Sequence, residues 1–186
     1  MTGAERRQRV AHGVSRGFES NEIKPRRGER KPKARNMAHT YTSLLSHIIF
    51  STKDRLPMLD AELKARLFPY MGGIIRELGG AALSINGPTD HVHILASLPA
   101  TIALSDFVGK VKANSSGWVH KTFPARREFK WQVGYGAFSV SVSQRPRVLA
   151  YIAGQEEHHR KVSFKEEFIG FLKKHGITYD ERYVFD

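Results

Sequence analysis

Two histidines, His91 and His93, stand two residues apart in the segment DHVHIL, residues 90–95. In a β-strand, residues two apart point to the same face, so the two imidazoles project side by side while Val92 and Ile94 face the other way. Two imidazoles placed like this can chelate one divalent ion. The alternative is a pair of histidines on an exposed sheet face that bind nothing, and the motif alone leaves both interpretations open.

A tyrosine and a glutamine, Tyr151 and Gln155, are four residues apart in the segment YIAGQEEHH. On a helix they share one face. A tyrosine hydroxyl can attack phosphorus, but its pKa is about 10 when free, so it needs a cation or a base nearby. Gln155 would bring a neutral oxygen to the ion. The alternative is a tyrosine that packs at the core edge with its hydroxyl in water.

The other tyrosines and histidines are weaker candidates. No glutamine follows one turn after Tyr135, Tyr179 or Tyr183. His47 lies among apolar residues of a predicted strand, which favours a structural role. His158 and His159 follow Gln155, and we expect them to be exposed at a helix end, with a contact to DNA or a second metal shell as the alternative.

The elements that must position these residues follow from apolar periodicity. Strands are predicted over residues 41–51, 82–86, 91–98 and 135–143, and helices over 59–78, 105–120, 147–160 and 164–175. Ser105 is expected to cap the second helix, and Gly176 to end the last one. The order β-α-β-β-α-β predicts a ferredoxin-like α+β fold. Its antiparallel sheet has helices on one face, and C-terminal helices carry the tyrosine.

The charge of the chain favours a polyanionic partner. Thirty Lys and Arg against 18 Asp and Glu give a net charge of +12 over 186 residues, and such a field attracts nucleic acid above all. Residues 1–36 hold 11 basic and four acidic residues, a net +7, and are predicted to be a disordered basic arm. Met37 allows an alternative, in which the protein starts at this methionine and the arm is not native. The domain is predicted over residues 37–186.

Several residues are candidates for contact with DNA. Basic side chains expected to meet phosphates are Lys110, Lys112, Lys121, Arg126, Arg127 and Lys130. Trp131 and Tyr135, the latter between two glycines, are expected to stack on bases. The alternative for the basic residues is that they are simply solvated on the surface. The alternative for Trp131 and Tyr135 is a turn that leads into an edge strand. The absence of cysteine excludes disulfides and thiolate sites. Without an apolar membrane span or a secretory signal, a cytoplasmic protein is expected.

Taken in order, the motifs resemble those of the Y1 transposases of the IS200/IS605 type, including the REP-associated tyrosine transposases, within the HUH single-strand nuclease superfamily. The resemblance covers residues 38–186 and rests on the segments HIIFSTK (47–53), DHVHIL (90–95), GYGAFS (134–139), YI with Gln155 and the His158-His159 pair, and FKEEF (164–168). The basic arm has no counterpart in it.

The resemblance implies a metal-dependent single-stranded DNA endonuclease and strand transferase. His91, His93 and Gln155 would hold Mg²⁺ or Mn²⁺, and Tyr151 would form a 5′-phosphotyrosine link. Mg²⁺ prefers oxygen ligands, so this donor set suits Mn²⁺ better and predicts weak binding without DNA. The implied partners are single-stranded DNA hairpins and a second copy of the chain, with the sites assembled in cis or in trans. No nucleotide cofactor is needed.

Two other functions remain open from the sequence. One is a non-catalytic ferredoxin-like module that binds nucleic acid on its sheet, which would need aromatic side chains where His91 and His93 stand. The other is a domesticated relative that acts on repeated palindromes.

Overall fold

The computed structural model describes residues 41–182 and residue 184. The predicted basic arm, residues 1–36, lies outside the described residues. Four strands form one antiparallel sheet in the order β2-β3-β1-β4: β1 (Leu45–Ser51), β2 (Ala81–Asn86), β3 (His91–Ser97) and β4 (Gly136–Ser139). The predicted β-α-β-β-α-β order and the α+β class are confirmed.

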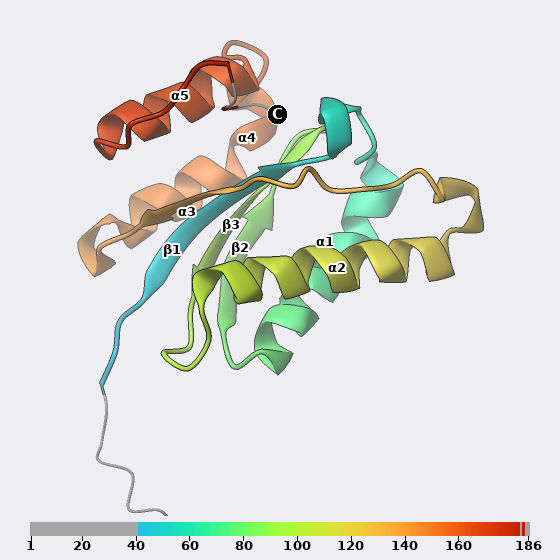
Figure 1. The fold of residues 1–186 in the computed structure, drawn as a ribbon, viewed down its shortest axis with the longest axis horizontal. Coiled ribbons are helices and arrows are strands. Elements are labelled where there is room, and N and C mark those ends of the chain that lie inside the picture. Colours follow the sequence, from blue (N-terminus) through green and yellow to red (C-terminus); the bar gives the residue numbers. More distant parts are fainter. Residues whose placement is uncertain (1–40, 183, 185–186) are drawn as a thin grey trace, which may run out of the picture. The chain divides into compact units, whose positions relative to one another are not determined.

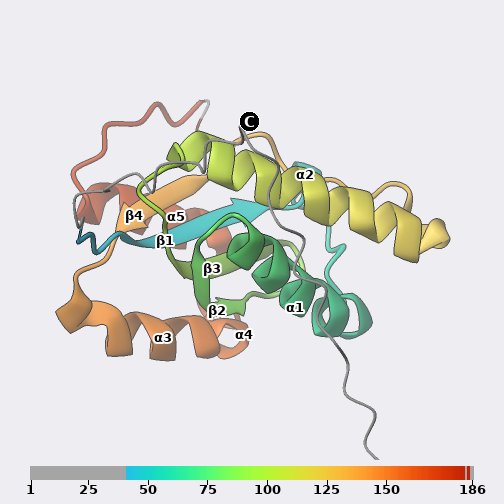
Figure 2. The ribbon, with the colours of Figure 1, turned by 90° about the horizontal axis from the view of Figure 1, so that it is seen from below.

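Helices cover both faces of the sheet (Figures 1 and 2). One face packs against α1 (Ala61–Glu77) and α2 (Leu104–Thr122), through the strand residues Phe50, Val92 and Ile94. The other face packs against α3 (Arg145–Ala153), α4 (Gln155–His158) and α5 (Phe164–Lys174), which come later in the chain. The C-terminal helices therefore occupy the face that the ferredoxin-like order leaves uncovered.

The central strand β3 is buried along its whole length except at Ser97, because it has a strand on each side and helices above and below. Alternation along β3 sends Val92 and Ile94 into the core beneath α1 and α2. His91 and His93 must then point to the opposite face, toward α4 and α5.

Some predicted boundaries were wrong. Helix α2 begins at Leu104 after Ala103, so Ser105 lies inside the helix and does not cap it. Strand β4 ends at Ser139, one backbone hydrogen bond from Val140 N to Leu45 O follows it, and Val142–Gln144 forms a 3-10 turn instead. The helix predicted over 147–160 begins at Arg145 and is interrupted at Gly154, so Gln155 starts α4.

Other local predictions were confirmed. Gly176 ends α5 with a φ of 64°, a left-handed conformation that glycine adopts without steric cost. Further 3-10 turns occupy Lys53–Arg55 and Pro124–Arg126. None of the helices in the described residues is both long enough and apolar enough to span a membrane.

Candidate functional site

The paired histidines lie side by side on β3, as the strand period predicts. The exposed fraction is 1% for His91 and 0% for His93, and their ring centroids are 5.1 Å apart. The prediction that they share a face is confirmed. The alternative of two histidines on an exposed surface is excluded, because α4 and α5 cover them.

A second layer of contacts orients each ring. His91 Nδ1 lies 2.7 Å from Asp90 Oδ1, and His93 Nδ1 lies 3.0 Å from His47 Nε2. His47 is thus buried, and its partner is one of the paired histidines. That its role is structural stays a prediction. A hydrogen bond from one ring nitrogen to a carboxylate or to another ring fixes which of the two imidazole nitrogens is left free. In both histidines the Nε2 atom is the one turned to the site.

Helix α5 brings a carboxylate, Glu167, into the centre of the site. A capping box between Ser163 and Glu166 fixes the start of α5. Phe168 and Leu172 hold the helix against the sheet, and Glu167 lies beside them with only 7% of its surface exposed. Its Oε2 atom is 3.3 Å from His93 Nε2 and 3.9 Å from His91 Nε2.

A third imidazole, His159, completes this cluster. Its Nε2 atom is 2.9 Å from His91 Nε2 and 3.4 Å from Glu167 Oε2, and its Nδ1 is 2.8 Å from the Val162 carbonyl oxygen. We expected His159 to be exposed at a helix end. It is instead half-buried and faces inward, because the chain turns at residues 159–163 to lead into α5.

The tyrosine and the glutamine reach the same carboxylate from α3 and α4. The Tyr151 hydroxyl donates a hydrogen bond to Glu167 Oε1, and Gln155 Nε2 donates to that oxygen over 3.3 Å. The Tyr151 ring lies 6.1 Å from the His93 ring. The break at Gly154 does not separate the two side chains. The structure therefore places Tyr151, Gln155 and the histidine pair together in one chain.

The protonation states follow from burial and from Glu167. Burial lowers the pKa of His91 to about 4 and that of His47 to about 3, and it also lowers the pKa of His93. Burial would raise the pKa of the Glu167 carboxyl, but the adjacent imidazoles of His159 and His93, with the Tyr151 hydroxyl, outweigh it and hold that pKa below its usual range. At neutral pH the site contains a carboxylate facing the neutral imidazoles of His91 and His93, whereas Glu167 outweighs burial at His159 and raises the pKa of that imidazole.

The nucleophile candidate is protonated in this state. Burial, with the hydrogen bond to Glu167, raises the pKa of Tyr151 above its ordinary value. A phenol of this kind reacts only when its proton has a place to go or when a cation stabilises the phenolate. Glu167 Oε1 already accepts that proton in a hydrogen bond.

Several buried polar atoms in the site point at no protein partner. Among the described residues, His93 Nε2, Gln155 Oε1, His158 Nε2 and Glu167 Oε2 have no hydrogen-bond partner. Unpaired buried polar atoms are rare and costly unless an ion or water satisfies them. The ligand atoms of His91, His93, His159 and Glu167 lie within 4.8 Å of one another, a spacing that a single metal ion can fill.

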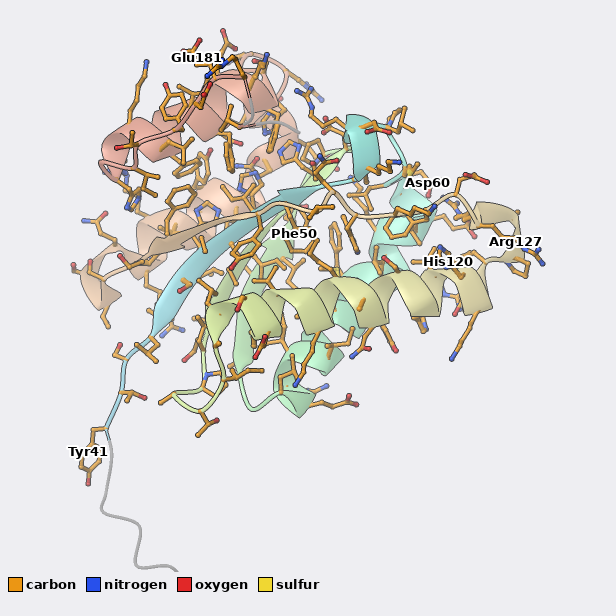
Figure 3. All side chains as sticks on the ribbon, in the orientation of Figure 1. Tyr41, Phe50, Asp60, His120, Arg127 and Glu181 are labelled. Atoms are coloured by element: carbon orange, nitrogen blue, oxygen red, sulfur yellow. The ribbon has the colours of Figure 1, made fainter. Side chains whose placement is uncertain are left out.

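The predicted DNA contacts lie elsewhere. Lys110, Lys112 and Lys121 are on α2, on the opposite face of the sheet, and Figure 3 shows Arg127 beyond the end of α2, away from α5. Arg126 pairs with Asp60 and Glu62, and Lys130 is exposed.

The two aromatic candidates differ in their surroundings. Trp131 is 8% exposed, with its indole nitrogen donating to Ser115 Oγ, so its ring is part of the core. Tyr135 is 38% exposed in the loop before β4.

A cavity of about 680 Å³ opens beside the nucleophile candidate. Tyr151, His158 and Glu167 line it on one side, and the basic side chains Arg147 and Lys174 line it as well. Sequence reasoning missed these two basic residues, and it missed Glu167. A signal for Glu167 was present: it interrupts the apolar stripe of Phe164, Phe168 and Phe171 on one helix face, where a charged residue needs a partner.

Paired histidines on a central strand, with a tyrosine facing them from a C-terminal helix, form the arrangement that the resemblance to HUH single-strand nucleases implied. The family model described as "Transposase IS200 like" matches residues 40–155. The chain therefore belongs to the IS200-like transposase family, and it is an enzyme that cuts and joins DNA. The match includes His91, His93, Tyr151 and Gln155, and it ends before His159 and Glu167.

Curated relatives support this assignment. The chain is 27% identical over 116 residues to the ISDra2 transposase TnpA of Deinococcus radiodurans, covering 60% of this chain and 83% of the relative. It is also 27% identical over 136 residues to the transposase of insertion sequence IS200 from Salmonella typhimurium, covering 68% and 86%.

Solved structures show the same fold. A candidate transposase from Deinococcus radiodurans superposes with a TM-score of 0.51 at 24% identity, over 68% of this chain and 98% of that one. A REP-associated tyrosine transposase bound to a REP hairpin gives a TM-score of 0.50 at 14% identity, over 67% and 74%.

Proposed function

We propose that the chain is a metal-dependent single-stranded DNA endonuclease and strand transferase that works through a 5′-phosphotyrosine at Tyr151. One observation carries the proposal: the Tyr151 hydroxyl and the Nε2 atom of His93 meet at the two oxygens of one buried carboxylate, Glu167. A nucleophile beside a cluster of metal-ligating side chains is the arrangement that phosphoryl transfer needs.

The residues present fit a divalent ion. His91 and His93 would hold it, and the unpaired Oε1 atom of buried Gln155 is available as a further ligand. When bound, the ion would polarise the phosphoryl oxygen and stabilise charge on the leaving oxygen. Imidazole ligands favour Mn²⁺ over Mg²⁺ at this site.

The residues of the chain account for the rest of the step. Tyr151 Oη would form a bond to phosphorus, and the bond from phosphorus to the 3′ oxygen would break. Glu167 Oε1, which accepts the Tyr151 hydrogen bond, would take the phenol proton as the bond forms and release it through water to the leaving 3′ oxygen. The products would be a 5′-phosphotyrosine and a free 3′-OH. Attack on the link by that 3′-OH or by another one would rejoin strands without a nucleotide cofactor.

The cavity beside Tyr151 supports a DNA substrate. Arg147 and Lys174 line it, and cationic side chains position phosphates. The REP-associated transposase that shares the fold was solved with a REP hairpin, which supports single-stranded DNA hairpins as the substrate here. The basic residues of α2 and the following loop, with Tyr135, would be a second contact surface on the other face of the sheet.

The assembly of the site supports catalysis in cis. Tyr151 contacts Glu167 of its own chain, and Glu167 lies against the paired histidines of that chain. A homodimer, which the family resemblance implies, would then carry two complete sites.

The test is capture of the covalent intermediate. The protein is incubated with Mn²⁺ and labelled single-stranded DNA from the ends of its own locus, and protein–DNA bands are resolved on denaturing gels. We expect a metal-dependent band that is lost in Tyr151→Phe and in His91→Ala/His93→Ala. Tyr135→Phe is the matched control and should keep the band.

Other outcomes would contradict the proposal. A band that survives Tyr151→Phe would move the nucleophile to another tyrosine. Tight, salt-sensitive binding without any band would favour the non-catalytic binding module. Against that module stands the sheet itself, whose histidine-bearing face is covered by α3 and α5 and offers no open platform for bases.

A further inference from the structure

The geometry points to a metal centre of three histidines and one carboxylate, in which His159 Nε2 and Glu167 Oε2 join the Nε2 atoms of His91 and His93. This inference rests on the proposed function, since it concerns the same metal site. It differs from the expected set of two histidines and a glutamine in its donors, and it predicts that the site binds metal without DNA.

The separations of the four atoms fit one ion. Glu167 Oε2 lies 3.3 Å from His93 Nε2, 3.4 Å from His159 Nε2 and 3.9 Å from His91 Nε2, and the His91 and His159 Nε2 atoms are 2.9 Å apart. Ligands about 2.0–2.2 Å from a shared ion stand about 3.3–3.6 Å apart in a tetrahedral shell. These four distances, 2.9–3.9 Å, bracket that range, and all four atoms lie within 4.8 Å of one another, so the side chains would draw together on a bound ion.

The hydrogen bonds behind the rings of His91 and His159 direct the two Nε2 atoms toward each other, where they share a hydrogen bond that a metal ion would replace. The Val162 carbonyl oxygen can only accept, so His159 Nδ1 donates to it, and His91 Nδ1 donates in the same way to Asp90 Oδ1. In a neutral imidazole the other nitrogen then carries a lone pair. Two lone pairs facing each other at 2.9 Å require a proton or a cation between them. Metal-ligating histidines characteristically donate their outer N–H to a carboxylate or a carbonyl.

The two oxygens of Glu167 have different surroundings. Oε2 faces the imidazole nitrogens and has no hydrogen-bond partner among the described residues. Oε1 accepts from Tyr151 and from Gln155, and His158 Nε2 lies 3.4 Å from it. Oε2 is therefore free to ligate the ion while Oε1 holds the nucleophile, which fixes the Tyr151 hydroxyl beside the metal centre.

The donor set selects the ion. Three imidazoles and one carboxylate suit Mn²⁺, Co²⁺ or Zn²⁺, whereas Mg²⁺ requires oxygen ligands. Because Glu167 is on α5 and His159 precedes it, a bound ion would also tie the C-terminal helix to the sheet. Metal should therefore raise the melting temperature of the protein in the absence of DNA.

The experiment measures metal binding by the full chain without DNA, with Co²⁺ followed by its visible absorption and Mn²⁺ by its free-ion EPR signal. The test variants are Glu167→Gln and His159→Asn, whose side-chain amide keeps a donor for the Val162 carbonyl but has no atom at Nε2. Matched controls are Glu157→Gln, which alters an exposed glutamate, and His120→Asn, which alters an imidazole on α2, on the opposite face of the sheet.

We expect the wild type to bind Co²⁺ with the intense absorption of a four-coordinate ion. Each test variant should bind metal at least about tenfold more weakly, since even the partners behind metal ligands contribute that much. The controls should stay near the wild-type affinity. Circular dichroism and thermal unfolding without metal would show that the test variants fold.

Two results would overturn the inference. In the first, both Glu167→Gln and His159→Asn bind metal as tightly as the wild type, while His91→Ala/His93→Ala no longer binds it. The other is the absence of metal binding by the wild type without DNA. In either case the covalent-adduct assay decides separately whether the proposed function stands, because it requires only Tyr151, the paired histidines and metal in the presence of DNA.

Discussion

The ammonium group of Lys112 is held between two backbone carbonyls of the loop before β4. Its Nζ atom donates to Val133 O and Gly134 O, each over 2.9 Å, and lies 5.2 Å from the centre of the Phe50 ring. Burial lowers the pKa of Lys112 to about 8. A residue predicted to contact phosphate thus anchors the loop that carries Tyr135.

This environment makes stability depend on pH. Lysine in an unfolded chain has a pKa of about 10.4, so between about pH 8 and pH 10 the unfolded chain holds a proton that the native chain has lost. The free energy of unfolding of the wild type, relative to Lys112→Met, should rise as pH rises through that window. Urea unfolding of both proteins below pH 8 and near pH 10 measures the difference. Parallel pH profiles would show that Lys112 keeps its proton when folded.

The sequence was sufficient to predict those site residues whose partners are close in the chain. His91 and His93 share a strand, and the two-residue period places them on one face whatever surrounds them. Glu167 lies more than 70 residues later, and nothing local indicates that α5 folds back over that face. The interpretation of Trp131 was wrong for a different reason: an aromatic residue directly after a loop rich in Lys and Arg fits base stacking as well as it fits a core position.

At the scale of elements, the contact between β4 and α5 sets the height of Glu167 above the sheet. A Cβ atom added at Gly136 would lie 2.7 Å from Phe168 Cε2 and 3.1 Å from Phe138 Cε2. The Phe168 ring is buried, so it has little room to move away. The absence of a side chain at residue 136 is therefore what lets α5 approach the sheet this closely.

We expect Gly136→Ala to destabilise the protein by about 1–3 kcal/mol, the usual cost of overpacking. It should also reduce covalent-adduct yield, because α5 would shift and carry Glu167 with it. Gly134→Ala is the matched control, since a Cβ there meets nothing within 4 Å. Thermal unfolding and the adduct assay on both variants test this. Equal melting temperatures for the two would mean that β4 and α5 are not packed as described.

The elements themselves were largely predictable, because alternation and helical spacing are local signals. The single helix expected over residues 147–160 was not, since Gly154 interrupts it between the predicted nucleophile and Gln155. The packing of α5 on the histidine face could not be derived either. The sequence leaves that face to a ligand or to another element, and only the three-dimensional fold decides that it is another element.

At the scale of the whole molecule, the sheet separates two basic surfaces. The histidines, Tyr151 and the cavity with Arg147 and Lys174 lie on one face, and the lysines of α2 lie on the other. A hairpin bound on the α2 face would have to pass around a sheet edge for its cleavage site to reach Tyr151. The net charge of +12 thus indicates that the protein binds nucleic acid, but it does not indicate which face of the sheet carries the active site.

A mixing experiment shows whether one chain is sufficient for the reaction. Size-tagged Tyr151→Phe is combined with untagged His91→Ala/His93→Ala, so that neither protein has both the nucleophile and the histidine pair. Assembly in cis, as the Tyr151–Glu167 contact indicates, predicts no covalent adduct on either chain. Wild type mixed with tagged Tyr151→Phe is the control and should give adduct on the untagged chain alone. Adduct on the histidine-deficient chain would mean that its Tyr151 had entered the site of the partner. The helices would then exchange between subunits, and the contact seen within one chain would describe a resting arrangement.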